Sequence, residues 1–515
     1  MGNILTRALL VLGGLAAIAA ALMCLPAGTT TLALPTTLGD GPVLFRLSPD
    51  ALWLMGFGLV PAVLACALST SSTRGGYGWL FGAAMSLLGA LGVFGLQEGA
   101  ALLIAWELMS FGGALMILSE RLSGAGGRPV LFMLALLEVG AVALLVAIVL
   151  LSLPAGDLRF DAFARTAANS SGGRQALIGL LILIGFGAKL GLLPFYEWFP
   201  AAYGSGSGAS GAILSGVVLN AAFFGLSRGL VEWLPASTPA IGIVVVAVAT
   251  VSAVLAVLYA FQQEDWRALL SFSSAENASI AVATLGASLM FRADAQTGLA
   301  ALAWTVALLH LAGHSLAKGA LFLAADTVYR TAGSYSIVHT DLLSRSAWPF
   351  GLGALFAAMS LAAMPPQAGF VSEWYVFQTI FQGFHLSTLG GRLTLSIAGA
   401  GLALTAAVAF ATFVKIFGIG LLGRTSRPVA AAPAGSVAAV ALLGLCVIAL
   451  AAGMPAWLPA LDGTVADLFG THTALDMRVG WVLVPGTGAP IAPDRSFAFI
   501  SPSLLAIAMP LLSLV

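Results

Sequence analysis

The fold of this chain is decided by residues 177–229, which read LIGLLILIGFGAKLGLLPFYEWFPAAYGSGSGASGAILSGVVLNAAFFGLSRG. Lys189 lies inside an apolar run long enough to reach the middle of a bilayer, and Pro194 and Pro200 interrupt the helix within a few residues of it. A charged side chain at that depth costs at least ~2.5 kcal/mol on insertion scales. A broken helix is tolerated there only where it is buried in protein or lines a cavity. The stretch therefore predicts a path for an ion or a proton through a membrane protein.

The composition sets the class of protein. The chain has 515 residues, of which 60% are hydrophobic and 8% charged, whereas soluble domains carry about 25% charged residues. The net charge is zero, so nothing indicates a nucleic acid partner. Three cysteines, Cys24, Cys66 and Cys446, are far apart and lack the spacing of metal ligands. We therefore expect a polytopic membrane protein that holds no metal or redox cofactor.

Apolar runs near the length of a spanning helix recur along the chain. We predict an all-α protein with about 14–15 transmembrane helices. The first run resembles a signal peptide, but we interpret it as a retained helix because the rest of the chain inserts as well. The predicted helices cover 5–25, 51–70, 77–95, 99–119, 129–152, 174–193, 209–231, 238–261, 267–289, 297–324, 347–364, 370–386, 396–421, 434–453 and 499–515.

Two interruptions of similar kind indicate an internal repeat. The first is the break after Lys189, and the second is the run MPPQAG at 364–369, which leads to Glu373. Paired breaks in the two halves of a transporter mark a binding site near the middle of the membrane. The predicted divisions are N-terminal helices at 1–98, a first repeat at 99–261, a second repeat at 262–424, and C-terminal helices with a polar loop at 425–515.

The lysines have an unusual distribution. The chain has 21 basic residues, but the only lysines are Lys189, Lys318 and Lys415, and all lie inside or at the edge of apolar segments. Arginine stays protonated, whereas a buried lysine can release its proton. This predicts a role in transport for Lys189 and Lys318. Lys415 is near a helix end, where extension to the membrane interface is an equal alternative.

Three glutamates lie within apolar segments. Glu107 is near the middle of its span and needs a partner, for which Lys189 is the candidate. Glu138 is also well inside an apolar run, as an accessory candidate. Glu276 is flanked by small polar residues, so hydrogen bonding between helices is favoured over a role in transport.

His310, His314 and Lys318 follow one another at a spacing of four residues, which places them on one face of a helix. A proton relay is the favoured interpretation because histidine titrates near neutral pH. Packing with hydrogen bonds and a metal site are the alternatives. The metal site is disfavoured because no glutamate follows His310 as in the helix of a zinc protease.

Several motifs in order along the chain carry a family resemblance. They include WELMS at 106–110, GFGAKLGLLPFYEWFPAAY at 185–203, LLHLAGHSLAKGALFLAA at 308–325, MPPQAGFVSEW at 364–374 and FVKIFGIGLLGR at 413–424. The chain resembles the antiporter-like membrane subunits of respiratory complex I, Mrp-type antiporters and energy-converting hydrogenases. Within them it is most similar to the large membrane subunit of the formate hydrogenlyase and hydrogenase-4 type.

This resemblance implies two inverted five-helix repeats, each with a broken helix, and a row of charged and polar groups at mid-membrane. Glu107 matches the glutamate paired with the first-half lysine, which is Lys189. Lys318 matches the central lysine, with His310 and His314 in the connecting row. The resemblance also implies that the terminal position of the row is Glu373.

Two positions depart from the family pattern. Tyr196 stands where relatives carry histidine, and Asn220 stands where they often carry lysine or histidine. Neither replacement titrates near neutral pH, although both can anchor water. The proton path of the first half is therefore expected to be altered, or the chain is a divergent paralogue with weakened transport.

The resemblance and the buried charges together predict a proton-translocating subunit of a redox-driven complex in the inner (cytoplasmic) membrane of a prokaryote. The expected partners are other membrane subunits, the peripheral subunits that perform the oxidoreductase reaction, and the lipid bilayer. The expected ion is the proton, with sodium as the alternative. The rival functions are an Mrp-type cation/proton antiporter subunit and a membrane subunit of an inorganic-carbon uptake system.

Overall fold

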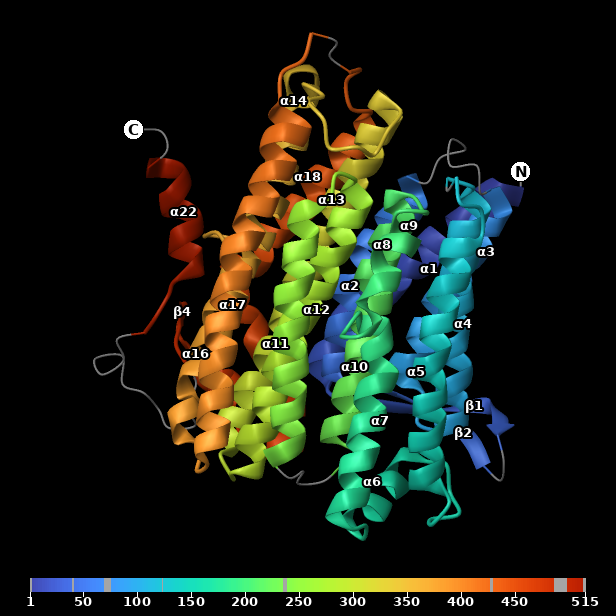
Figure 1. The fold of residues 1–515 in the computed structure, drawn as a ribbon, viewed down its shortest axis with the longest axis vertical. Helices are drawn as coiled ribbons and strands as arrows, with labels where there is room; N and C mark the ends of the chain where they lie inside the picture. Colours follow the sequence, from blue (N-terminus) through green and yellow to red (C-terminus); the bar gives the residue numbers. More distant parts are fainter. Residues whose placement is uncertain are drawn as a thin grey trace.

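The computed structural model describes residues 2–38, 41–68, 76–122, 124–234, 239–426, 429–485 and 498–512. Long helices run side by side through most of the molecule (Figure 1). Within the described residues, 11 helices are long and apolar enough to cross a membrane. The predicted class, an all-α polytopic membrane protein, is confirmed.

The N-terminal part holds five long helices and one hairpin. The hairpin pairs Thr30 with Leu47 in antiparallel register and was not expected from the sequence. It lies at the same end of the molecule as α6 (Figure 1). The elements are α1 (Gly2–Cys24), β1 (Thr30–Leu38), β2 (Gly41–Leu47), α2 (Pro49–Leu68), α3 (Gly76–Gly95), α4 (Gly99–Glu120) and α5 (Arg128–Ser152).

The first broken helix follows. Helix α7 ends where Gly191 adopts a left-handed conformation with φ of 72°, which favours glycine because it has no Cβ. A Cβ there would also stand 2.6 Å from the ring of Phe199. The elements are α6 (Phe160–Ala168), α7 (Gly172–Leu190), α8 (Trp198–Tyr203), α9 (Gly208–Ile213), the π-helical turn η3 (Leu214–Val218) and α10 (Leu219–Val231).

The second broken helix divides at residues 362–367. Each break contains one cis peptide bond, at Leu193–Pro194 and at Pro365–Pro366. The long elements of this part are α11 (Pro239–Gln262), α12 (Trp266–Ala293), α13 (Thr297–Ala332), α15 (Trp348–Leu361), α16 (Ala368–Phe381), α17 (Leu389–Lys415) and α18 (Ala434–Ala452).

The rest of the C-terminal part is short helices and turns with one small hairpin. The predicted polar loop at 454–498 is thus largely structured where it is described. Its elements and the terminal helix are α19 (Met454–Trp457), η6 (Leu458–Leu461), α20 (Asp462–Phe469), α21 (Thr473–Asp476), β3 (Arg478–Val479), β4 (Val482–Leu483) and α22 (Pro502–Leu512).

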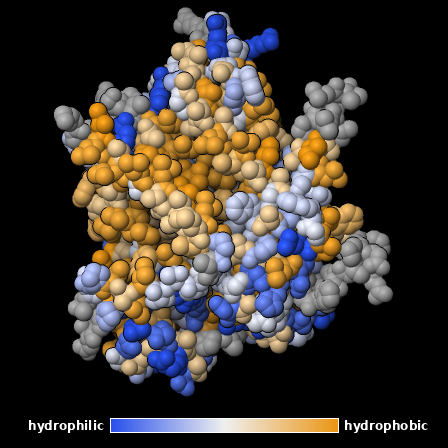
Figure 2. All heavy atoms as spheres, turned by 180° about the vertical axis from the view of Figure 1, so that it is seen from behind, coloured by the Kyte–Doolittle hydropathy of each residue, from blue (hydrophilic) through white to orange (hydrophobic). Residues whose placement is uncertain are grey.

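Helix α13 is the centre of the packing. It has 36 residues and contacts α2, α9, α12, α15, α16 and α18. Small residues allow this close approach, as is usual between helices in membranes. A Cβ at Gly319 of α13 would lie 2.1 Å from Pro61 of α2. Apolar residues cover the middle of the face in Figure 2, with hydrophilic residues gathered at its lower end.

Each half of the chain contains one discontinuous helix, α7–α8 in the first half and α15–α16 in the second. The predicted repeat boundaries at residues 99, 262 and 424 stay predictions. Helix α12 is almost wholly buried, but the 11 apolar spans do not include it. Its serines, threonine, asparagine and glutamate lower its hydropathy, and they face protein instead of lipid.

Candidate functional site

The first buried cation stands at the break of α7–α8. Lys189 lies in the last turn of α7 and is 2% exposed. Its Nζ donates hydrogen bonds to the carbonyl oxygen of Trp106 at 3.1 Å and to Ser110 Oγ at 2.6 Å. The same nitrogen lies 4.0 Å from the centre of the Trp106 ring. The ammonium group is therefore held by α4, through two neutral acceptors and an aromatic face.

Glu107 is adjacent to Trp106 on α4 and is partly buried. Its carboxyl group interacts electrostatically with Lys189 and with Glu138 of α5, which is also within hydrogen-bonding reach. Among the described residues, however, no ion pair within 4.0 Å joins Glu107 to Lys189. The predicted approach of Lys189 to α4 is thus present. The lysine is hydrogen-bonded to Ser110, and Glu107 acts on it electrostatically without a direct ion pair. Glu138 is exposed on the outer side of α5.

Asn220 connects the two halves of the molecule. It is 0% exposed, and its Nδ2 donates to the carbonyl oxygen of Leu54 at 2.8 Å and to Ser315 Oγ at 2.9 Å. Ser315 follows His314 on α13. Asn220 Oδ1 is buried and has no protein partner within the described part of the chain. The departure at this position thus provides a polar bridge from α10 to Ser315 of α13.

The two histidines lie on α13 and are buried. His310 Nδ1 is 3.1 Å from Ser372 Oγ, which belongs to α16 beyond the second helix break. Both ring nitrogens of His314 are buried, and neither has a hydrogen-bond partner among the residues described. The spacing of four residues places the pair as predicted. His310 thus contacts the second broken helix.

Lys318 is the second buried cation and is 0% exposed. Its Nζ donates to the carbonyl oxygen of Leu270 at 3.1 Å and lies 5.4 Å from the ring centre of Phe413. The charge of Glu276 on α12 acts on Lys318. Like Lys189, this lysine rests on a neutral carbonyl, with a carboxyl group nearby.

Glu276 of α12 is close enough to act electrostatically on both Lys318 and Glu373. Its Oε2 accepts a hydrogen bond from Ser273 Oγ at 3.0 Å. Sequence reasoning gave Glu276 a secondary role because its neighbours in the chain are small and polar. Its position in the row depends on the packing of α12 against α13 and α16, which residue spacing does not reveal.

The other two accessory residues lie outside the row. Tyr196 is partly exposed and its ring stacks on Tyr259 with the centroids 5.7 Å apart. Lys415 ends α17 and forms an ion pair with Glu264 at 3.1 Å. It also donates to the carbonyl oxygen of Gln263 at 2.7 Å. These contacts fasten α17 to the end of α11, which fits the alternative of a lysine at a helix end.

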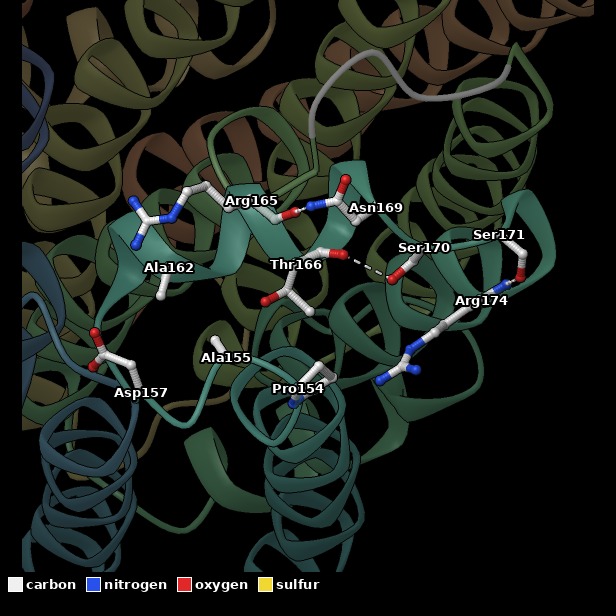
Figure 3. A pocket seen from close by; sticks show the side chains of 10 residues that line it. All are labelled: Pro154, Ala155, Asp157, Ala162, Arg165, Thr166, Asn169, Ser170, Ser171 and Arg174. Carbon is white, nitrogen blue, oxygen red and sulfur yellow. Dashed lines mark hydrogen bonds between the residues drawn. The ribbon is translucent and has the colours of Figure 1, made fainter.

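A cleft of about 580 Å³ lies away from the row, beside α6 (Figure 3). Arg165, Arg174 and Asp157 are among the residues that line it. Arg174 donates to the carbonyl oxygen of Leu150 at 2.7 Å. Because this cleft is at the end of the helices, it is no part of the buried row.

No group of three or more His, Cys, Asp or Glu side chains is arranged to hold a metal ion in the described ranges. Cys24 and Cys446 are free thiols, and Cys66 is buried. The pair of His310 and His314 has no third ligand of these types within this part of the structure.

Residues 98–396 match the family described as NADH:quinone oxidoreductase/Mrp antiporter, TM. The chain is 30% identical to hydrogenase-4 component B of Escherichia coli, over 80% of this chain and 61% of the relative. It is 30% identical to formate hydrogenlyase subunit 3 of Escherichia coli, over 56% of this chain and 48% of the relative. A Na(+)/H(+) antiporter subunit A1 of Staphylococcus aureus is 28% identical over 58% of this chain and 38% of the relative.

The chain therefore matches between 38% and 61% of the length of these three relatives. Its fold is similar to a chain of the Mrp complex from Dietzia sp., with a TM-score of 0.76 at 16% identity, over 92% of this chain and 94% of that one. It is also similar to a chain of respiratory complex I from Thermus thermophilus, with a TM-score of 0.75 at 19% identity, over 92% and 98%. The family match covers both broken helices and the buried row from Lys189 to Glu373. The chain belongs to the NADH:quinone oxidoreductase/Mrp antiporter family of antiporter-like membrane subunits.

Proposed function

We propose that this chain is the proton-translocating membrane subunit of a redox-driven complex of the hydrogenase or formate hydrogenlyase type. The observation that supports this best is the buried row of ionisable and polar side chains between the two helix breaks. It starts at Lys189, passes Asn220, the two histidines and Lys318, and ends at Glu373.

The energetics of burial support a transport role for the row. Each buried charge in a membrane protein is costly, and a purely structural core is more stable with apolar residues of similar volume. Here Lys189, Lys318 and Glu276 are almost fully buried, and none of the three takes part in an ion pair within the described ranges. Groups of this kind exchange protons with their neighbours when small movements change the balance of charge.

The driving step would come from partner subunits. The three cysteines of this chain are far apart in sequence, so we assign the redox centres to peripheral subunits and not to this chain. A conformational change transmitted to α4 would move Glu107 relative to Lys189. A closer carboxylate holds the lysine proton and a more distant one releases it, because an opposite charge favours the charged form. The partners, the protons and a location in the inner membrane of a prokaryote are parts of this proposal.

An Mrp-type cation/proton antiporter is the second candidate, and the similarity to the Na(+)/H(+) antiporter subunit favours it. In that case a sodium gradient, and not a redox reaction, would drive proton movement. The two candidates differ in what drives proton movement across the membrane.

The test uses the complex purified with its natural partners and reconstituted in lipid vesicles. A pH-sensitive dye reports proton movement on addition of the electron donor or, separately, of a sodium gradient. We expect proton movement that requires the donor and stops in Lys189→Ala and Lys318→Ala complexes. Proton movement driven by sodium alone would favour the antiporter. Normal redox-driven pumping in both lysine variants would refute the proposal.

A further inference from the structure

A second group of buried carboxylates lies at the end of the molecule where α4 finishes. Glu120, the last residue of α4, is 0% exposed. Its Oε2 accepts hydrogen bonds from the backbone nitrogen of Ser207 at 2.8 Å and from Ser210 Oγ at 3.0 Å. Its Oε1 is buried without any hydrogen-bond partner in the described part of the chain. A buried carboxylate oxygen left unpartnered is unfavourable unless it takes up a proton or is hydrated.

Asp326 of α13 faces the same loop but is fully bonded. Its Oδ1 accepts from the backbone nitrogen of Gly208 at 2.6 Å and from the Tyr335 hydroxyl at 2.7 Å. Its Oδ2 accepts from the backbone nitrogen of Ala209 at 2.9 Å. Asp326 therefore anchors the start of α9, whereas Glu120 keeps one oxygen for another partner.

The charged surroundings of Glu120 are few. Asp326 and Tyr335 interact with it electrostatically. Arg267 of α12 stacks over the Tyr335 ring at 3.9 Å, but its guanidinium is already paired with Asp265 at 2.9 Å. Within the described ranges, no cation pairs with either buried carboxylate. Glu120 is thus a buried acid beside a second acid, an arrangement that disfavours two charges at once.

A cleft of about 330 Å³ lies beside the end of α4 that carries Glu120. Ile117, Arg121 and Ser205 are among its lining residues. A Cβ added to Gly206 would stand 3.2 Å from Ile117 Cγ1 and 3.3 Å from Glu120 Oε2. Gly206 therefore lies against both Ile117, which lines the cleft, and the carboxyl group of Glu120.

Hydroxyl groups continue from this site toward the row. Ser215 Oγ lies 2.9 Å from Ser274 Oγ, which donates to the carbonyl oxygen of Leu270 at 2.9 Å. Lys318 Nζ donates to that same carbonyl oxygen. Ser210 and Ser215 stand in succession along α9 and η3, one near Glu120 and the other near the lysine. Ser210 and Ser215 thus mark the two ends of a stretch of α9 and η3 that bonds to Glu120 at one end and to Ser274 at the other.

We propose that Glu120 is a proton-loading carboxyl that takes protons from the cleft beside Arg121 and Ser205 and passes them through Ser210 toward Lys318. This inference rests on the proposed function, because Glu120 would supply the buried row with protons from one face of the membrane. Asp326 is assigned a positioning role in the same site. It holds the loop so that Ser207 and Ser210 reach Glu120.

The test compares two variants in the vesicle-reconstituted complex. Glu120→Gln keeps an acceptor oxygen for Ser207 and Ser210 but cannot load a proton, so proton uptake per electron should fall at least about tenfold while the complex assembles. Glu120→Asp keeps the acid and should retain most of the uptake. Asp326→Asn is the matched control. It replaces one acceptor oxygen by an amide donor and should lower thermal stability more than Glu120→Gln does.

A second measurement does not depend on changing Glu120. In a background without the three natural cysteines, Ser205→Cys should react with a thiol reagent that cannot cross membranes, and only from one side. The reaction should then slow proton uptake, because the label fills the cleft. Normal uptake in Glu120→Gln or in the labelled protein, with Lys318→Ala inactive, would overturn this inference alone. Normal pumping in Lys318→Ala would instead overturn the proposed function.

Discussion

Lys189 Nζ and Ser110 Oγ lie 2.6 Å apart, and Ser110 is three residues beyond Glu107 on α4. The lysine therefore rests on a neutral hydroxyl about 4.5 Å along the helix axis from the carboxylate expected to pair with it. A movement of one helical turn would exchange a neutral acceptor for a charged one. In the structure the ammonium of Lys189 therefore rests on two neutral acceptors.

Ser110→Ala should disturb this balance directly. It removes the shorter of the two hydrogen bonds of Lys189, and a hydrogen bond to a charged group contributes about 1.5–3 kcal/mol. We expect the ammonium to shift toward Glu107 and redox-driven pumping to fall by about tenfold, the rate equivalent of ~1.4 kcal/mol. Dye-monitored vesicles provide the measurement. Ser110→Thr retains the hydroxyl and should pump nearly normally, and equal loss in both variants would count against this role.

Lys318→Ala should block pumping by about a hundredfold, the scale of losing a proton-transfer group. Lys318→Arg should fail as well, because arginine does not release its proton at working pH. Both complexes should assemble and retain donor oxidation by the peripheral subunits. Measuring donor oxidation beside proton movement separates loss of coupling from loss of the enzyme. Wild-type pumping in Lys318→Arg would contradict the relay.

Asn220→Ala should lower pumping, because it removes the bridge from α10 to Ser315. Asn220→Lys together with Tyr196→His restores titratable groups at both positions and should leave transport intact or raise it. Tyr196→Phe is the control. The ring of Tyr196 stacks on Tyr259 away from the row, so pumping should change less than about twofold. A strong defect in Tyr196→Phe with a silent Asn220→Ala would place the first-half path elsewhere.

Gly369→Ala should destabilise the second broken helix. The added Cβ would stand 1.8 Å from the carbonyl oxygen of Ser360, whereas one at Gly390 would meet nothing within 4 Å. Overpacking of this kind costs about 1–3 kcal/mol. Thermal unfolding of the purified complex should therefore shift downward in Gly369→Ala and not in Gly390→Ala. Equal melting temperatures would show that α15 and α16 separate easily.

His472→Ala tests an ion pair outside the membrane-spanning helices. A hydrogen bond from the imidazole to Asp462, at 2.7 Å, raises the pKa of His472 above its usual value. A raised pKa in the folded state stabilises the protein below the unfolded value of about 6.5 and loses this effect as pH rises through the folded value. The variant should therefore melt lower than wild type at acidic pH and equally at alkaline pH. A difference that grows with pH would contradict the pairing.

The sequence by itself determined the class, the family and most of the buried row. Hydrophobic runs of sufficient length can form only spanning helices in a bilayer, because every backbone polar group must be satisfied within the chain. The prolines beside Lys189 and before Glu373 likewise predicted where the two helices break. The spacing of His310, His314 and Lys318 placed them on one face because the α-helix has a fixed period.

Only the tertiary structure decided which groups meet. Lys189 is bonded to Ser110 and not to Glu107. Glu276 acts electrostatically on both Lys318 and Glu373, and Tyr196 lies outside the row. Glu120 and Asp326 are more than 200 residues apart but face one loop. These contacts follow from the packing of α4, α9, α12 and α13 against their neighbours through small residues. Helix periodicity places a residue on one face of its own helix, but only packing determines which neighbouring residue that face meets.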